Sequence, residues 1–267
     1  MKKITSLQNS FVKQVVTWQE KAKERKRDEK IVIEGLKEIE KALRAGYLPE
    51  TMVFCAEKIS LEEIKEQLPF SVLEQATWIE VSLEVFAKMA YREDSKNLLM
   101  ISTPKNHELS LLRISSCPLL IVLEAVEKPG NLGAILRTAD AAGVDALIVC
   151  DNQTDLYNPN VIRASVGCVF TVPVAVASSS EAIRWLKEKN IQICCTALSA
   201  AKPYHLADFR LPTAIVLGTE ATGLTTQWLQ ASDANIIIPM SGYADSLNVS
   251  TSCAIVVFEA KRQRNFR

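Results

Sequence analysis

The sequence has no long apolar run, no CxxC cysteine pair and only two histidines, and each absence excludes a class of protein. A membrane helix needs about eighteen consecutive apolar residues, and no segment approaches that length. Polar residues at 5–10 interrupt the apolar core that a signal peptide would need behind the first lysines. The seven cysteines lie mostly in apolar contexts, as in proteins of reducing compartments. We therefore expect a cytoplasmic protein with neither a membrane segment nor a metal site.

The glycine fingerprints of common nucleotide-binding enzymes are also missing. No GxGxxG opens a crossover and no GxxxxGK[ST] occurs, which argues against a dehydrogenase and a phosphate-loop NTPase. The turn EKPGNLG at 127–133 lacks the clustered glycines that Rossmann-type methyltransferases place against their cofactor. A nucleotide-dependent oxidoreductase is therefore the weakest functional hypothesis.

Charge is balanced overall but uneven along the chain. The net charge is zero, which excludes a polyelectrolyte, yet basic residues gather in KAKERKRDEK at 21–30 and KRQRNFR at 261–267. The second stretch has no acid and contains Lys261, Arg262, Arg264 and Arg267. A basic run is usually a solvated helix face, unless other features point to nucleic acid, where it would supply phosphate contacts.

The N-terminal part has the pattern of a small α/β unit. With 267 residues and 48% hydrophobic content, the chain can fold into one or two well-packed domains. Periodicity predicts helices from about residue 10 and over 36–43, 61–68 and 82–90, with short strands between them. Residues 105–116 are polar with weak periodicity, so we expect a linker there between domains at 1–104 and 117–267.

The C-terminal part alternates apolar strands with amphipathic helices, including a strand over 169–176 and a helix over 132–142. Near-continuous apolar strands between such helices predict a parallel sheet covered on both faces. Ligands of doubly wound sheets bind outside the carboxyl ends of the strands. Three motifs lie at such ends: NLGAILRTADAAG at 131–143, IVLGTEATGL at 215–224 and IIIPMSGYADSLNVS at 236–250.

The third motif combines the features of a small-molecule pocket. Pro239 should end an apolar strand, and Gly242 permits backbone conformations that other residues avoid. Ser246 is a suitable N-cap for the last helix, whose free N–H groups would face the loop. Asn131 is a suitable cap for the helix that carries Arg137.

Together and in this order, the three motifs resemble the SpoU/TrmH family of RNA ribose 2′-O-methyltransferases, within the SPOUT superfamily. The resemblance is strong over 117–267 and weaker over the N-terminal part. It implies an α/β trefoil-knot catalytic domain with a mostly parallel sheet, preceded by a small ribosomal-protein-like α/β domain that binds RNA. It further implies S-adenosyl-L-methionine as cofactor, a homodimer, and ribosomal RNA as substrate in preference to transfer RNA.

The resemblance also assigns residues to roles. Backbone groups hold the cofactor and neighbouring residues shape the pocket wall; the positions are Thr196, Gly218, Ile238, Met240, Gly242 and Leu247. The implied catalytic residues are Asn131, Arg137, Glu220, Ser246 and Asn248. Arg163, in NPNVIRASVG at 158–167, resembles a position that such enzymes use around the RNA or the dimer interface.

Simpler structural roles are open for several of these residues. Gly218 could be only a tight turn, Arg137 a surface arginine, and Glu220 a solvated carboxylate. Because a guanidinium stays protonated, we predict that Arg137 stabilises the developing oxyanion or clamps the adjacent phosphate, and is not a general base. The alternatives to the main functional hypothesis are the same chemistry on transfer RNA and a catalytically silent RNA-binding homologue.

Overall fold

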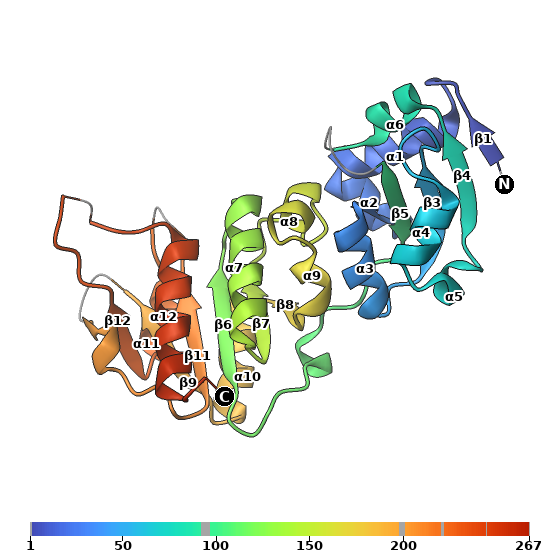
Figure 1. Cartoon of the computed structure of the whole chain (residues 1–267). Coiled ribbons are helices and arrows are strands. Elements are labelled where there is room, and N and C mark those ends of the chain that lie inside the picture. The colour runs from blue at the N-terminus through green and yellow to red at the C-terminus, as the bar shows by residue number, and fades with distance from the viewer. Residues whose placement is uncertain (1, 92–96, 198–200, 220–221, 244, 267) are drawn as a thin grey trace. The chain divides into compact units, whose positions relative to one another are not determined.

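The computed structural model describes residues 2–91, 97–197, 201–219, 222–243 and 245–266. Packing divides the chain into two compact units (Figure 1). Unit 1 comprises 1–106 together with 155–171, and unit 2 comprises 107–154 together with 172–267.

Unit 1 is a mixed sheet of five strands with helices against it. Its elements are β1 (Lys2–Ile4), α1 (Ser10–Glu20), α2 (Ala22–Asp28), β2 (Ile31–Glu34), α3 (Leu36–Arg44), β3 (Pro49–Phe54), α4 (Leu61–Gln67), α5 (Phe70–Leu73), β4 (Thr77–Val81), α6 (Leu83–Met89), β5 (Leu98–Ser102), α8 (Pro159–Ala164) and α9 (Cys168–Thr171). The strand order is β1-β4-β3-β5-β2, with β5 antiparallel to both of its neighbours. The small α/β unit expected from the sequence is confirmed.

The helices of unit 1 begin where capping residues allow. The Asn9 side chain accepts a hydrogen bond from the backbone N–H of Phe11 at 2.9 Å, which starts α1 at the predicted place. Val12 and Val15 of α1 and Phe86 of α6 are buried in one core cluster with strand residues. This apolar face holds both helices against the sheet.

Residues 155–171 pack against α3 and β2, although they lie far along the chain. The Arg25 guanidinium is 4% exposed, pairs with Asp155 at 2.7 Å and also donates to two backbone carbonyls. The hydroxyls of Tyr47 and Tyr157 are 2.9 Å apart. A buried charge needs such partners, so Arg25 belongs to the interior of unit 1 and is not available to a phosphate.

Unit 2 is built on seven strands. Its elements are η1 (Leu109–Leu111), β6 (Leu119–Glu124), α7 (Pro129–Ala142), β7 (Ala146–Cys150), β8 (Val174–Ala177), α10 (Ser179–Glu188), β9 (Gln192–Thr196), β10 (Lys202–Pro203), η2 (Tyr204–Leu206), β11 (Thr213–Leu217), α11 (Thr226–Ala231), β12 (Ala234–Ile237) and α12 (Val249–Gln263). The order is β10-β12-β9-β11-β6-β7-β8, and every pair is parallel.

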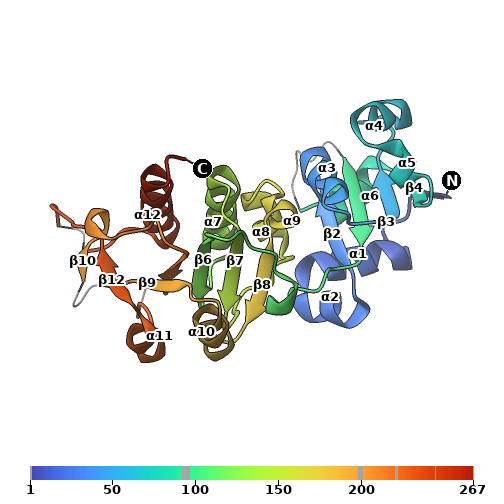
Figure 2. The ribbon, with the colours of Figure 1, turned by 90° about the horizontal axis from the view of Figure 1, so that it is seen from below.

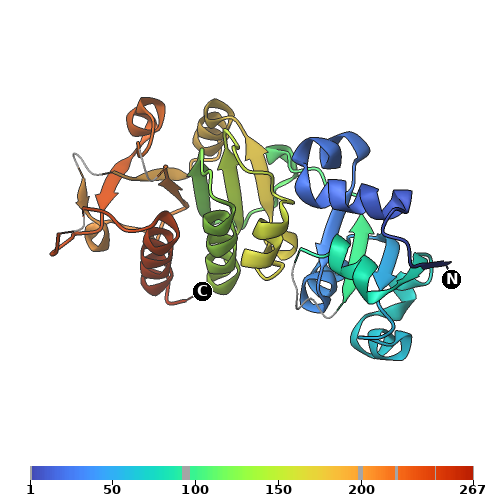
Figure 3. The same ribbon diagram turned by 90° about the horizontal axis from the view of Figure 1, so that it is seen from above.

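Helices cover both faces of this sheet, which confirms the doubly wound arrangement. α7 and α12 lie on one face and α10 and α11 on the other (Figures 2 and 3). Leu120 and Val122 of β6 pack in one buried cluster with Leu186 of α10 and Trp228 of α11. Because alternate strand residues point to opposite faces, strands buried on both sides must be apolar throughout, as the sequence shows.

One local expectation is wrong. The apolar run 169–176 is not one strand: it contributes to α9, and β8 starts only at Val174, after Pro173. Within the expected linker, the carbonyl of His107 accepts the backbone N–H of Val176, and Leu109 packs on the sheet core. An apolar run alone does not distinguish strand from buried helix.

The basic C-terminal stretch is largely used within the fold. The Arg264 side chain donates to four backbone carbonyls, those of Cys117, Pro118, Phe209 and Leu211. Burial lowers the pKa of this guanidinium below its usual value. Lys261 is buried and Arg262 pairs with Glu259 at 2.7 Å, while Arg267 lies outside the described residues. Arg264 and Lys261 are therefore neither a solvated helix face nor available for phosphate contacts.

None of the helices in the described part of the chain has the length and apolarity to cross a bilayer.

Candidate active site

The carboxyl ends of β9, β11 and β12 meet at one edge of the unit 2 sheet. The Thr196 hydroxyl donates to the carbonyl of Val216 at 3.1 Å, and Thr196 lies in register with Ile236. Gly218 follows β11 by one residue, and Ile238 follows β12 by one. The predicted cofactor residues Thr196, Gly218 and Ile238 therefore lie at adjacent strand ends.

The first and third motifs meet through two asparagines. The Asn248 side-chain amide donates to the Asn131 side-chain oxygen at 3.1 Å, across 117 residues of sequence. Asn131 lies in the first turn of α7, and Asn248 directly precedes α12. This bond places the starts of the two helices side by side, as the site hypothesis requires.

Both predicted helix caps are wrong. The N-cap of α7 is Lys128, so Asn131 lies within the helix and leaves its side chain for Asn248. The N-cap of α12 is Asn248, whose side-chain oxygen accepts from the backbone N–H of Ser250 at 3.0 Å. The Ser246 hydroxyl instead donates to Asp245 at 3.5 Å. Proline at the first helical position sets the start of α7 before Asn131.

Gly218 and Gly242 differ in how much space surrounds them for a side chain. A Cβ on Gly218 would lie 2.3 Å from the backbone of Gly223, so the chain's own backbone occupies the space that a side chain would need. A Cβ on Gly242 would meet nothing within 4 Å, and its φ is not in the left-handed region. The expectation that Gly242 uses a special backbone conformation is wrong.

A pair of alanine variants tests this difference. Gly218→Ala should lower the free energy of unfolding by about 1–3 kcal/mol, because overpacking forces the 218–225 loop to shift. Gly242→Ala should change it by less than about 0.5 kcal/mol. Urea unfolding of both variants measures the difference, and equal values would contradict the close approach of Gly218 to its loop.

The segment 238–247 has backbone groups left over for a ligand. Ile238 and Met240 are half-buried, and Leu247 is 37% exposed. Within the described residues, backbone groups of 238–247 make no hydrogen bond with other backbone groups. Such unpaired N–H and C=O groups need water or a ligand as partner.

Arg137 and Glu220 remain less well defined. Arg137 is exposed on α7 and makes no hydrogen bond or ion pair within the part of the chain that the structure describes. The described contacts do not join it to Gly218, Ile238 or Leu247, so its place in the pocket stays a prediction. Glu220 lies outside the described residues.

Sequence analysis missed Glu124, a carboxylate that is 2% exposed at the end of β6. It accepts the backbone N–H of Thr225 at 2.8 Å and the Thr225 hydroxyl at 2.6 Å. The only signal in the sequence was one charged residue closing the apolar run LLIVLE. Local pattern does not reveal a partner that lies 101 residues away.

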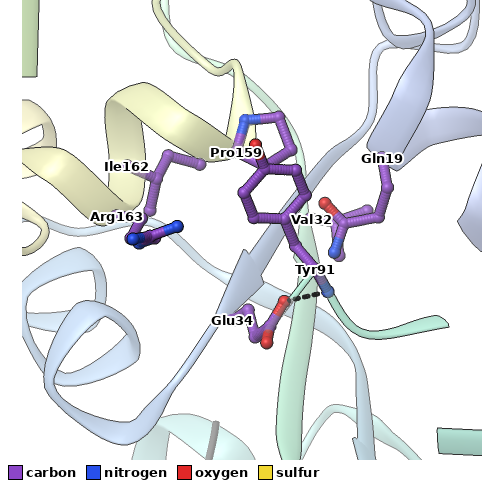
Figure 4. Close-up of a pocket in the computed structure, with 7 residues that line it drawn as sticks. All are labelled: Gln19, Val32, Glu34, Tyr91, Pro159, Ile162 and Arg163. Carbon is purple, nitrogen blue, oxygen red and sulfur yellow. Dashed lines mark hydrogen bonds between the residues drawn. The ribbon is translucent and has the colours of Figure 1, made fainter. Parts of the chain in front are cut away.

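Arg163 lies in unit 1, where it lines a small cavity with Gln19, Glu34 and Tyr91 (Figure 4). The Glu34 carboxylate accepts the backbone N–H of Tyr91 at 2.6 Å. The Gln19 side-chain oxygen is buried and has no hydrogen-bond partner among the described residues. Arg163 therefore belongs to unit 1, whereas the three motifs belong to unit 2.

No group of three or more histidine, cysteine, aspartate or glutamate side chains in the described ranges is arranged to hold a metal ion.

Two protein-family profiles match this chain. The profile of the SpoU rRNA Methylase family matches residues 118–258, more than half of the chain. The chain belongs to the SpoU family. The profile of the MRM3-like substrate binding domain matches residues 9–99 of this SpoU-family protein. The family and the fold class expected from the sequence are confirmed.

Relatives of this SpoU-family protein include RNA-modifying enzymes. The 23S rRNA (guanosine(2553)-2′-O)-methyltransferase RlmP of Bacillus subtilis is 28% identical over 262 residues, which cover 98% of this chain and 100% of RlmP. The 23S rRNA (guanosine-2′-O-)-methyltransferase RlmB of Shewanella oneidensis is 40% identical over 160 residues, 59% of this chain and 65% of RlmB. The chain thus spans about two thirds of RlmB.

Solved structures agree over nearly the full length. A crystal structure described as an RNA 2′-O ribose methyltransferase has a TM-score of 0.85 and 38% identity, covering 98% of this chain and 99% of its own. The AdoMet-bound rRNA methyltransferase of Sinorhizobium meliloti has a TM-score of 0.88 and 30% identity, covering 98% and 97% respectively.

Proposed function

We propose that this protein transfers a methyl group from S-adenosylmethionine to a ribose 2′-hydroxyl of ribosomal RNA. The observation that carries the proposal is the Asn131 to Asn248 bond, which joins the two outer motifs of a SpoU-family chain at one edge of the sheet. Full-length relatives named as 23S rRNA 2′-O-methyltransferases support the same chemistry.

The residues present fit S-adenosylmethionine. The backbone groups of 238–243 and 245–247, which bond to no other backbone group among the described residues, offer donors and acceptors beside the half-buried side chains of Ile238 and Met240. A mainly apolar pocket with a few placed polar groups is how proteins hold such ligands. Gly218, Ile238 and Leu247 would hold the cofactor by their backbone, and Thr196, Met240 and Gly242 would form the wall. When bound, the cofactor supplies an activated methyl group.

The chain's own contribution is then positioning and charge. The 2′-hydroxyl must lose its proton as its oxygen attacks, and the charge that develops there needs a nearby donor. The Arg137 guanidinium stabilises that oxygen or the adjacent phosphate. Asn131 lies on α7 together with Arg137, and its side chain is oriented by Asn248. Asn131 would position the target nucleotide next to Arg137. Ser246 and Glu220 are assigned to the catalytic residues, and Glu220 would pair with Arg137 or accept hydrogen bonds from the cofactor loop.

RNA binding fits the surface charges that the fold leaves free. Lys21, Lys23 and Lys26 are exposed on or beside α2, and their phosphate contacts would be independent of sequence. We assign RNA recognition to residues 1–104, joined by 105–116 to a catalytic domain at 117–267. Arg163 is assigned to the RNA or the dimer interface. A C-terminal trefoil knot, a homodimer and a cytoplasmic location complete the proposal.

The test uses purified protein, S-adenosylmethionine with a labelled methyl group, and ribosomal or transfer RNA from cells that lack the enzyme. We expect label at a nucleotide of ribosomal RNA, and the bond after it should resist alkali because the 2′-oxygen is blocked. Label found only in transfer RNA would show that the substrate is transfer RNA and not ribosomal RNA, with the same chemistry. Cofactor binding without transfer to any cellular RNA would favour a silent RNA-binding protein and overturn the proposal.

A further inference from the structure

Glu124 has no role in the proposed chemistry, yet it is a carboxylate held in the interior of unit 2. An isolated buried carboxylate is costly unless hydrogen bonds compensate it. Its two oxygens receive the backbone N–H and the hydroxyl of Thr225, at 2.8 and 2.6 Å. The Ser179 hydroxyl lies 3.3 Å away, but its single proton goes to the nearer carboxylate of Asp151. Both strong hydrogen bonds of Glu124 therefore go to Thr225.

Thr225 ends the loop that begins at Gly218. Within the described part of this loop, Thr219 and Gly223 exchange backbone hydrogen bonds at 3.1 and 3.2 Å. The backbone of Gly223 and Leu224 fills the space where a Gly218 Cβ would be. A shift of Thr225 would therefore move the backbone that packs on Gly218.

We propose that Glu124 is a positioning residue, which sets the affinity for S-adenosylmethionine by holding Thr225 and thereby the Gly223 and Leu224 backbone that packs on Gly218. This rests on the proposed function, in which the Gly218 backbone contacts the cofactor. Glu124 touches neither substrate nor cofactor, and it acts by holding one end of the loop in place. Pre-ordering a loop raises affinity because less entropy is lost on binding.

The test is Glu124→Gln, which keeps size but replaces one acceptor oxygen by a donor NH₂ group. The Thr225 hydroxyl must then turn to accept from the new NH₂ group, both bonds lose their charged acceptor, and the dissociation constant for S-adenosylmethionine should rise about tenfold. KM for the cofactor should rise by a similar factor, with kcat at saturating cofactor near the wild-type value. RNA affinity should not change. Isothermal titration with cofactor alone and steady-state kinetics provide these values.

Ser179→Ala is the matched control, because it removes a buried hydroxyl from the same polar cluster without touching Thr225. The Ser179 oxygen accepts the indole N–H of Trp228 at 2.8 Å, so this variant should lower Tm. Its cofactor affinity should remain at the wild-type value. An equal loss of cofactor affinity in both variants would show general destabilisation and overturn the positioning role.

Thr225→Val keeps the proposal testable if Glu124→Gln does not fold. Thr225 is exposed, and the substitution removes only its hydroxyl donor. The dissociation constant should rise about threefold or more. Wild-type cofactor affinity in Glu124→Gln or in Thr225→Val would overturn the positioning role of Glu124 but leave the proposed function standing. Failure of the unaltered protein to bind S-adenosylmethionine would overturn the proposed function.

Discussion

Arg137→Ala should reduce methyl transfer to ribosomal RNA by about 100- to 1000-fold, the usual loss when one donor to a developing oxyanion is removed. Tm should not change, because Arg137 is exposed and makes no hydrogen bond or ion pair within the described residues. Cofactor affinity should also be unchanged, since the proposed cofactor contacts are backbone groups of other residues. The loss should therefore appear in kcat and not in the KM for cofactor.

Two other variants show whether the guanidinium or only its charge is needed. Arg137→Lys keeps the charge without the planar fork and should recover only part of the rate. Arg184→Ala removes an exposed arginine from α10, on the opposite face of the sheet, and should leave the rate unchanged. An Arg137→Ala enzyme with wild-type kcat would remove Arg137 from the catalytic residues.

Arg264→Ala should lower the free energy of unfolding by about 2–4 kcal/mol, because four backbone carbonyls lose a charged donor. The cost stays in this range because the half-buried site lets water reach some of the carbonyls. For a domain of this size, Tm should fall by about 5–15 °C. Differential scanning fluorimetry and urea unfolding measure both quantities.

Arg262→Ala is the matched control, two residues earlier on the same helix. Arg262 is exposed and pairs with Glu259 one turn away, at 2.7 Å, and an exposed ion pair of this kind contributes little to stability. Its Tm should fall by less than about 2 °C. Similar Tm losses for Arg262→Ala and Arg264→Ala would show that the four carbonyl contacts contribute little to stability.

The elements of unit 2 were predicted where a local pattern has one explanation. Buried parallel strands must be apolar on both faces, so β6, β7, β9 and β11 stand out along the chain. The prediction of a strand over 169–176 was wrong because a short apolar run suits a buried helix as well as a strand. Its division between α9 and β8 depends on Pro173 and on what each half packs against.

The candidate site was predicted by motif but not in its detailed contacts. Asn131 and Asn248 were predicted to belong to one site and do bond to each other, yet Lys128 and Asn248 are the helix caps in place of Asn131 and Ser246. A cap is identified by which N–H groups its side chain reaches, and that depends on the residue at which the helix starts. Glu124 was missed for a related reason, since its importance comes entirely from Thr225.

By itself, the sequence determined the family, the alternation of strands and helices, and the three motifs at strand ends, because these follow from residue type and spacing along the chain. Only the tertiary structure decided which charges are used internally: Arg25 with Asp155, Glu124 with Thr225, and Arg264 with four carbonyls. Partners more than fifty residues apart meet only when the sheet assembles, and a buried charge is stable only once those partners surround it.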